Sequence, residues 1–353
     1  MKGPKTRDLA SLLDEGERRL ERGDAQGALE AARKAVRLAP DDARSLGLSA
    51  ASLAGLGRTE EARQAYERAV AAGGDDPFLL AEAASFLVDG TGEEPSTADL
   101  EAALELARKG SRLAREEGSA LSGELALVEG RTLAALGDPR AALARLADAR
   151  VALPEDAEVA VEYALALFEL CRFEDALKGI DDAVRMAPDD AFAHQSRGRV
   201  AERLGRRAEA RRSFERAHAL APGEFPTPLS LSAEEFDGAV EDAVASLPEA
   251  VRRYLSNVAI TVEDFPSPEE LLASDPPLSP SILGIFRGAP LQEKRSQDPW
   301  SHFPSSITLY QRNLETLVRD EEELLEEIGV TLLHEVGHFL GLDEEELAER
   351  GLG

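Results

Sequence analysis

Apolar and small residues recur at helical spacing through the first two-thirds of the chain, and a longer period of 34 residues lies over that pattern. Five positions align in two groups, and neighbours within each group are 34 residues apart. They are Gly23 and Gly57 in the first group, and Gly137, Cys171 and Gly205 in the second. A fixed period of this length indicates an array of stacked supersecondary units.

Each unit repeats further small residues at constant offsets. Five residues after each aligned position lie Ala28, Ala62, Ala142, Ala176 and Ala210, and twelve after lie Ala35, Ala69, Ala149, Ala183 and Ala217. Seventeen after lie Pro40, Gly74, Pro154, Pro188 and Pro222. Glycine permits a turn between two helices, small alanines let paired helices approach closely, and proline ends the second helix. Each unit is therefore predicted to be a helical hairpin.

This register resembles the tetratricopeptide repeat (TPR) and covers residues 7–222 with about six units. Gly57 and Gly137 are 80 residues apart, which leaves one longer unit, and the loop at 88–97 accounts for part of the excess. The resemblance implies an α-helical solenoid whose concave face holds peptides. We therefore expect a protein partner on that face.

The pattern changes after residue 222. The stretch PGEFPTPLS (222–230) contains three prolines and cannot continue a helical repeat. We expect the repeat array at 1–222, a proline-rich linker at 223–231 and a second domain at 232–353.

The second domain mixes helices and strands. Ser232 and Glu235 form a capping box for a helix at 233–246, and Asp320 and Glu323 signal another helix start. The elements that we predict are strands at 257–265, within 281–291 and within 305–315, a helix at 321–340 that stops at Gly341, and a short helix near 344–350. This order is typical of a small α+β domain.

The acidic net charge of the chain limits which classes of macromolecule it can bind. The net charge is −28, and residues 223–353 alone hold 8 Lys+Arg against 27 Asp+Glu. Nucleic acid and anionic membranes are poor matches for such a chain, whereas a basic peptide or protein is a better one. The single cysteine rules out an internal disulfide and a thiolate zinc site. The N-terminus lacks an apolar signal core and the chain lacks a membrane-length apolar run, so we expect a cytoplasmic protein.

Candidate chemistry appears near the C-terminus, in TLLHEVGHFLGLDEEEL at 331–347. His334 and His338 are four residues apart on a predicted helix, so both side chains project from one face and can hold one zinc ion. Glu335 follows the first histidine, as in the HExxH pattern of zinc peptidases, where the glutamate is the general base. The alternative interpretation is two helical histidines that bind no metal.

A catalytic zinc needs a third protein ligand. Gly341 ends the helix and lets the chain fold back, which brings a carboxylate into consideration: Glu344, six residues after His338, or Asp343, five after it. His302 is a further, lower-ranked candidate. The other two internal histidines, His194 and His218, lie in predicted repeat helices and are interpreted as ordinary helical residues.

Residues 232–353 also resemble the small bacterial zincin-like metallopeptidase family, long described as a domain of unknown function. The stretches that carry the resemblance are LPEAVRRYLSNVAITVEDFPS, ILGIFRGAPLQEKRS, ITLYQRN and TLLHEVGHFLGLDEEEL. It implies a minimal zincin fold, a zinc cofactor and an acidic third ligand at Glu344, where the family usually has Asp. The methionines are Met1 and Met186, so the chain lacks the methionine turn of a complete metzincin.

The resemblance implies hydrolysis of peptide bonds, with Glu335 assisting the attack of a metal-bound water. In zincins the substrate lies extended along an edge strand, and the candidate here is Ile307, Thr308, Leu309 and Tyr310. Tyr310 either stabilises the oxyanion or packs. The leading hypothesis is a zinc peptidase whose array recruits a substrate or partner. The alternatives are a non-catalytic metal-binding TPR scaffold and an acidic regulator that docks onto a basic partner.

Overall fold

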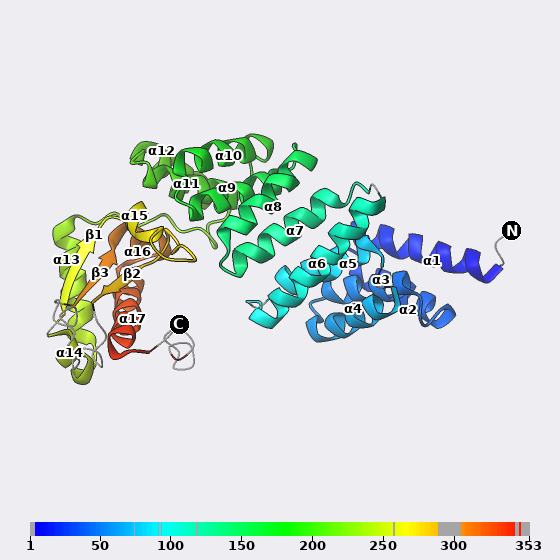
Figure 1. Cartoon of the computed structure of the whole chain (residues 1–353), viewed down its shortest axis with the longest axis horizontal. Coiled ribbons are helices and arrows are strands. Elements are labelled where there is room, and N and C mark those ends of the chain that lie inside the picture. The colour runs from blue at the N-terminus through cyan, green and yellow to red at the C-terminus, as the bar shows by residue number, and fades with distance from the viewer. Residues whose placement is uncertain are drawn as a thin grey trace. The chain divides into compact units, whose positions relative to one another are not determined.

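The computed structural model describes residues 4–73, 75–90, 92, 94–117, 119–256, 258–288, 305–342 and 346. The chain divides into two compact units, Met1–Leu167 and Phe168–Gly353 (Figure 1).

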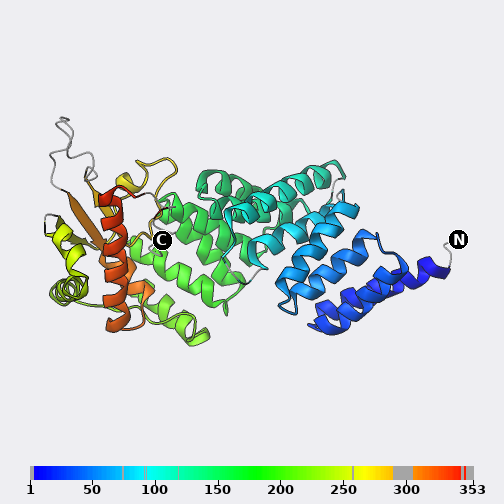
Figure 2. The same ribbon diagram turned by 90° about the horizontal axis from the view of Figure 1, so that it is seen from below.

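The first unit is helical throughout its regular structure. Its helices within the described residues are α1 (Pro4–Glu21), α2 (Ala25–Leu38), α3 (Ala43–Ala54), α4 (Thr59–Gly73), α5 (Pro77–Asp89), α6 (Thr97–Glu117), α7 (Ser122–Ala135), α8 (Pro139–Ala152) and the start of α9 (Ala157–Glu169). Successive helices pack as hairpins, α1 on α2, α3 on α4, α5 on α6 and α7 on α8 (Figures 1 and 2). The predicted helical hairpins are confirmed.

Six of the ten repeated alanines lie in these hairpins, and the other four lie in the repeat helices of the second unit. All ten of them are buried, none with more than 1% of its surface exposed. Side chains of this size let two helix backbones approach closely without leaving a void, because protein interiors are packed to crystal-like density. The small residues at fixed offsets therefore determine the helix spacing.

The turns within the hairpins require left-handed backbone. Gly23, Gly57, Gly137 and Gly205 have φ of 77°, 68°, 76° and 69°. Cys171 occupies the same position with φ 56°, and no other non-glycine residue in the described part of the chain has positive φ. Glycine adopts this conformation freely, whereas a Cβ makes it costly. The alignment of a cysteine with four glycines is thus confirmed by the backbone.

The longer unit is the third. Its first helix ends at Asp89 and its second, α6, runs for 21 residues from Thr97 to Glu117. The extra residues therefore lie both in the connecting loop and in a lengthened second helix.

The second unit begins with repeat helices and continues into an α+β fold. Its elements within the described residues are α10 (Phe173–Met186), α11 (Ala191–Arg203), α12 (Arg207–Leu220), α13 (Ala233–Ser246), α14 (Glu249–Leu255), β1 (Ala259–Glu263), α15 (Pro268–Leu271), β2 (Gly284–Arg287), β3 (Ser306–Tyr310), α16 (Gln311–Leu317) and α17 (Glu321–Leu340). The capping box at Ser232 is present, and α13 has the predicted bounds. The α+β class is confirmed, although α14 and α16 were not predicted.

The three strands form one sheet in the order β1-β3-β2. β1 runs parallel to β3, with Ala259 opposite Ser306, and β2 runs antiparallel to it, with Gly284 opposite Leu309. The expectation that residues 307–310 form an edge strand is therefore wrong. They lie between two partners, and all four side chains are fully buried.

Large apolar side chains fill the core between the sheet and two helices. α13 and α17 pack against each other, and α17 also contacts β2 and β3. The main members of this core are Phe236, Val240, Leu247, Ile307, Leu309, Leu314, Leu324, Ile328, Leu332 and Phe339. This packing places α17 directly beneath the sheet.

Within the second unit, the last repeat helices contact the α+β part. The Arg203 guanidinium lies 4.7 Å from the ring centres of both Phe173 and Phe265, and its Nη2 donates a 2.8 Å hydrogen bond to the Pro266 carbonyl. Arg199 donates to the Ser281 hydroxyl. The compact unit thus begins at Phe168, whereas the repeat helices end at Leu220, and the domain limits 1–222 and 232–353 stay predictions.

Among the described residues, no helix is both long and apolar enough to cross a bilayer.

Candidate metal centre

The helix that carries the histidine pair, α17, has strong signals at both ends. Asp320 accepts hydrogen bonds from the backbone N–H groups of Glu322 and Glu323, both at 3.0 Å. At the other end Gly341 adopts φ 89°, and the N–H of Leu342 bonds the Gly337 carbonyl at 3.1 Å. A side-chain N-cap and a left-handed C-terminal glycine fix a helix register. The predicted helix 321–340 and its stop at Gly341 are confirmed.

The two histidines face each other on this helix. Their Nε2 atoms are 3.0 Å apart, and their ring centres are 4.7 Å apart. The Nδ1 of His338 lies 3.2 Å from the Leu342 carbonyl. A proton on Nδ1 would be donated to that carbonyl, which leaves the Nε2 lone pair for a metal, and metal-bound histidines are commonly held in this way.

The nitrogen pair fits zinc. Two ligand nitrogens at about 2.0–2.1 Å from one tetrahedral ion are about 3.3–3.4 Å apart. The observed 3.0 Å separation is close to that value, so a small adjustment of the rings would admit the ion between them.

Glu335 is buried beside the edge strand β2. Its residue surface is 6% exposed. A Cβ built on Gly284 would lie 2.8 Å from Thr331 Cγ2 and 3.5 Å from Glu335 Cγ. The missing side chain at 284 therefore lets the start of β2 approach the turn of α17 that carries Glu335. A carboxylate in such a place is shielded from bulk water.

The expected third ligands, Glu344 and Asp343, and the lower-ranked His302 lie outside the described residues. Within the described part of the chain, no three side chains among His, Cys, Asp and Glu gather into a metal-binding group. A third ligand after Gly341 therefore stays a prediction.

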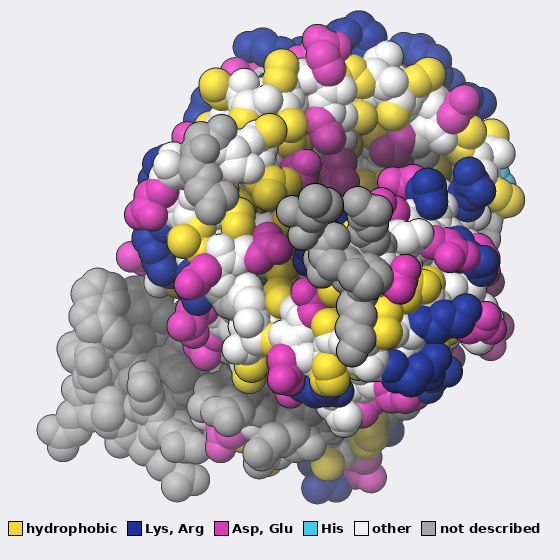
Figure 3. Space-filling view, turned by 90° about the vertical axis from the view of Figure 1, so that its right-hand side faces the viewer, with side chains coloured by type: hydrophobic (Ala, Val, Ile, Leu, Met, Phe, Trp, Pro, Cys, Tyr) yellow, Lys and Arg dark blue, Asp and Glu magenta, His cyan; other side chains and the backbone are white. Residues whose placement is uncertain are grey.

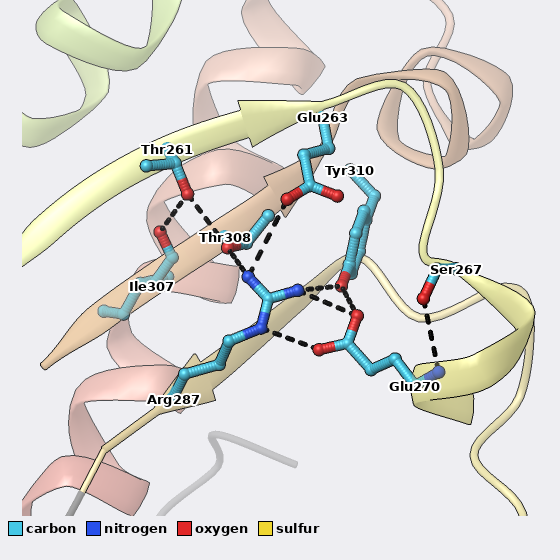
Figure 4. A network of polar contacts seen from close by, with 8 residues as sticks. All are labelled: Thr261, Glu263, Ser267, Glu270, Arg287, Ile307, Thr308 and Tyr310. Carbon is cyan, nitrogen blue, oxygen red and sulfur yellow. Dashed lines mark hydrogen bonds and ion pairs between the residues drawn. The ribbon is translucent and has the colours of Figure 1, made fainter. Parts of the chain in front are cut away.

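A polar network that the sequence did not reveal fixes β2 in place (Figure 4). Arg287 at the end of β2 donates to both carboxylate oxygens of Glu270, at 2.7 Å from Nε and 2.8 Å from Nη2. The Tyr310 hydroxyl donates to the same carboxylate at 3.0 Å. The guanidinium holds the pKa of Glu270 below its ordinary value. The bidentate pair ties β2 to α15, and such fork-like contacts are strong and directional.

The same network bears on Tyr310. Its ring is fully buried in β3, and burial together with the hydrogen bond to Glu270 raises the pKa of its hydroxyl. This position favours a structural role over oxyanion stabilisation. Glu270 and Arg287 are 17 residues apart in a loop-rich stretch, so no periodicity could have linked them.

The two repeat histidines make local contacts. His194 Nε2 lies 3.0 Å from the Pro188 carbonyl, and His218 Nδ1 lies 2.9 Å from the Phe225 carbonyl. Each contact is to nearby backbone, in keeping with their interpretation as ordinary helical residues.

Comparisons with known families agree with this architecture. Residues 255–352 match the family described as zincin-like metallopeptidase. Residues 13–77, 133–199 and 191–224 match three families, each described as tetratricopeptide repeat. The chain therefore joins TPR repeats to a zincin-like metallopeptidase domain, as the sequence predicted.

Similar solved structures share the repeat fold. They include pilF of Pseudomonas aeruginosa, with a TM-score of 0.54 and 18% identity over 67% of this chain and 99% of that chain. PilW, described as a widely conserved type IV pilus biogenesis factor, gives a TM-score of 0.54 and 15% identity over 61% of this chain and 94% of that one. These likenesses show the helical-repeat fold. No curated protein matches the chain.

Proposed function

We propose that the protein is a zinc-dependent peptidase whose TPR array recruits a substrate or partner. The observation that carries the proposal is the histidine pair on α17, with ring nitrogens 3.0 Å apart and the buried Glu335 between them in sequence. The zincin-like match over residues 255–352 supports it.

In this proposal three side chains hold the zinc ion and a fourth transfers a proton. His334 and His338 would hold the ion through Nε2, and an acid after Gly341, Glu344 or Asp343, would complete the ligand set. When bound, zinc would polarise the scissile carbonyl and make water acidic enough to ionise near neutral pH. The Glu335 carboxylate accepts the proton of the attacking water and delivers it to the leaving amine nitrogen.

The edge strand β2 is the better candidate for substrate alignment. Within the described residues it pairs on one side only, with β3, and Gly284 brings its start against Glu335. An extended peptide that added to its other side would gain backbone hydrogen bonds, as in other cases of strand addition. The Arg287–Glu270 pair would keep this strand rigid while it is used.

Metal content and turnover should be measured together. We expect about one zinc per wild-type chain, and loss of the metal from the His334→Ala/His338→Ala variant. Glu335→Gln should keep zinc while its cleavage of a library-selected peptide falls about 10² to 10⁴-fold, because only the base is removed. Glu326→Gln, at an exposed site of the same helix, is the control.

Two results would overturn these assignments. Full metal retention in the double-histidine variant would exclude the proposed ligands. Unchanged cleavage by Glu335→Gln would exclude the proposed base. Zinc-loaded protein that cleaves no library peptide would instead favour a non-catalytic metal-binding scaffold.

A further inference from the structure

A groove crosses four helices of the first unit. Pockets of about 410 Å³ and 400 Å³ share the side chains of Phe78 and Glu82 on α5. The first pocket is bounded by α1, α3 and α5, and the second by α3, α5 and α7, and Tyr66 of α4 also lines the second. Together they form a continuous depression over the first helices of successive hairpins, which we call the α5 groove.

The α5 groove offers an apolar surface. Phe78, the second residue of α5, is 53% exposed, and Leu48 and Ala51 of α3 line the same pocket. A large aromatic side chain left in water within a concave surface is a common anchor for a partner's apolar side chain.

Charge in the α5 groove is strongly one-sided. Among the described residues that line it are five acids and one arginine, and the acids are Glu17, Asp76, Glu82, Asp89 and Glu124. The arginine, Arg44, is 2.7 Å from Glu17 in an ion pair, and Arg131 of α7 forms another with Asp89 at 2.6 Å. Figure 3 shows the face of the molecule on the N-terminal side, where acidic and hydrophobic side chains lie toward the middle and many Lys and Arg side chains lie toward the edge.

The ionised form of the Glu82 carboxyl is disfavoured in the folded protein. Burial, and then the nearby charges of Glu17 and Asp76, raise its pKa to about 7. A cation placed beside this carboxylate would remove the repulsion and replace lost hydration with a charge-assisted hydrogen bond.

We propose that the α5 groove binds a peptide segment in which Lys or Arg stands beside an aromatic or large aliphatic side chain. The apolar side chain would pack on Phe78, and the cation would pair with Glu82. This deepens the proposed recruiting role of the array and rests on that role, but it requires neither zinc nor turnover. Complementary charge would also speed the encounter with such a partner.

Peptide selection on the full chain would test the proposal. A random peptide library would be displayed against the Glu335→Gln protein, so that bound peptides are not cut, and the enriched sequences measured by fluorescence polarisation. We expect enrichment of Lys or Arg next to aromatic or aliphatic residues, and binding that weakens as salt rises. Enrichment of acidic or purely polar peptides, or no enrichment, would overturn the proposal.

Matched variants locate the binding site. Glu82→Gln and Phe78→Ala should each weaken binding of a selected peptide about tenfold or more, because each removes one half-buried contact. Glu30→Gln and Val151→Ala, at exposed positions of α2 and α8 outside the groove, should change it less than about twofold. Equal losses in all four variants would contradict the assignment.

The result is independent of the metal centre. The same measurements on the His334→Ala/His338→Ala protein should give the same affinities. A peptide that still binds there would leave the α5 groove intact even if the peptidase proposal failed, whereas a zinc enzyme without groove binding would remove only the present inference. Circular dichroism of each variant would confirm that the helices are retained.

Discussion

The repeat array buries large side chains such as Leu29 and Leu146 together with a regular set of alanines, whereas the core of the α+β part consists mainly of large side chains. The repeated contact points of the array are alanines, all within 1% of complete burial. The core between the sheet and helices α13 and α17 is made mainly of Phe, Leu, Ile and Val, among them Phe236, Ile307 and Leu332. Array contacts are mostly local and depend on close backbone approach. The α+β core depends on bulky residues brought together from distant parts of the sequence. Loss of volume in that core and gain of volume at the repeated alanines therefore test two different kinds of packing.

Removing volume should be most costly in the α+β core. Ile307→Ala in the central strand β3 should lower the free energy of unfolding by about 2–5 kcal/mol, because it deletes apolar contacts and leaves a cavity. Hydrogen exchange of the β1 and β3 amides, measured alongside urea unfolding, would assign the loss to this region. A loss below about 1 kcal/mol would mean that the core relaxes around the site and does not depend on the volume of Ile307.

Adding volume should be the costly change in the array. Ala176→Leu on α10 should lower the free energy of unfolding by about 1–3 kcal/mol, because the helices must separate to admit it. Lys178→Leu, at an exposed position of the same helix, is the control and should have little effect. Similar unfolding free energies for the two variants would contradict close helix approach.

Glu202 lies where the last repeat helices contact the α+β part, and its ionisation should affect the stability of that contact. Burial raises its pKa to about 7, partly offset by Arg312, and Thr316 donates a 3.5 Å hydrogen bond to it. The folded state therefore binds a proton more tightly than the unfolded chain, whose ordinary value is 4.5, so stability falls as pH rises from about 4.5 to 7. Glu202→Gln should raise the unfolding free energy by about 1–2 kcal/mol at pH 8.

The pH dependence distinguishes this explanation from a general surface effect. The advantage of Glu202→Gln should shrink toward pH 5, where the wild-type carboxyl is protonated in the folded state. Urea unfolding at several pH values would measure it. An advantage that does not vary with pH would mean that the carboxylate charge is not the cause.

The smallest expected effect concerns Cys171, which stands where the other four aligned turn positions have glycine. Cys171→Gly should raise the unfolding free energy by about 1 kcal/mol, because a Cβ is unfavourable at its φ of 56°. Cys171→Ala keeps the Cβ and should give no such gain. Thermal unfolding of the three proteins side by side would show whether the backbone or the thiol determines the difference.

Sequence reasoning succeeded where the structural requirement lies within a short stretch. The turn at Gly205, the partner alanine five residues later and the stop of α17 at Gly341 each follow from local geometry. The histidine pair could be placed on one face because helical spacing alone determines it.

The sheet order and the polar network could not be predicted in the same way. β3 pairs with a strand 47 residues earlier and with another about 20 residues earlier, and its alternating pattern is compatible with an edge or a central place. The contact between Arg287 and Glu270 depends on that order, so it was missed with it.

The contacts of Arg203 determine where the protein can be divided into fragments. The zincin-like match begins at residue 255, and a fragment cut there, or at the proline-rich stretch, would lose Phe173 and Arg203. The ring of Phe265 and the carbonyl of Pro266 would then be exposed to water. A fragment that starts at Phe168 keeps the guanidinium between its two rings. Failure of a shorter fragment to stay soluble would therefore reflect the missing helices and would carry no information about catalysis.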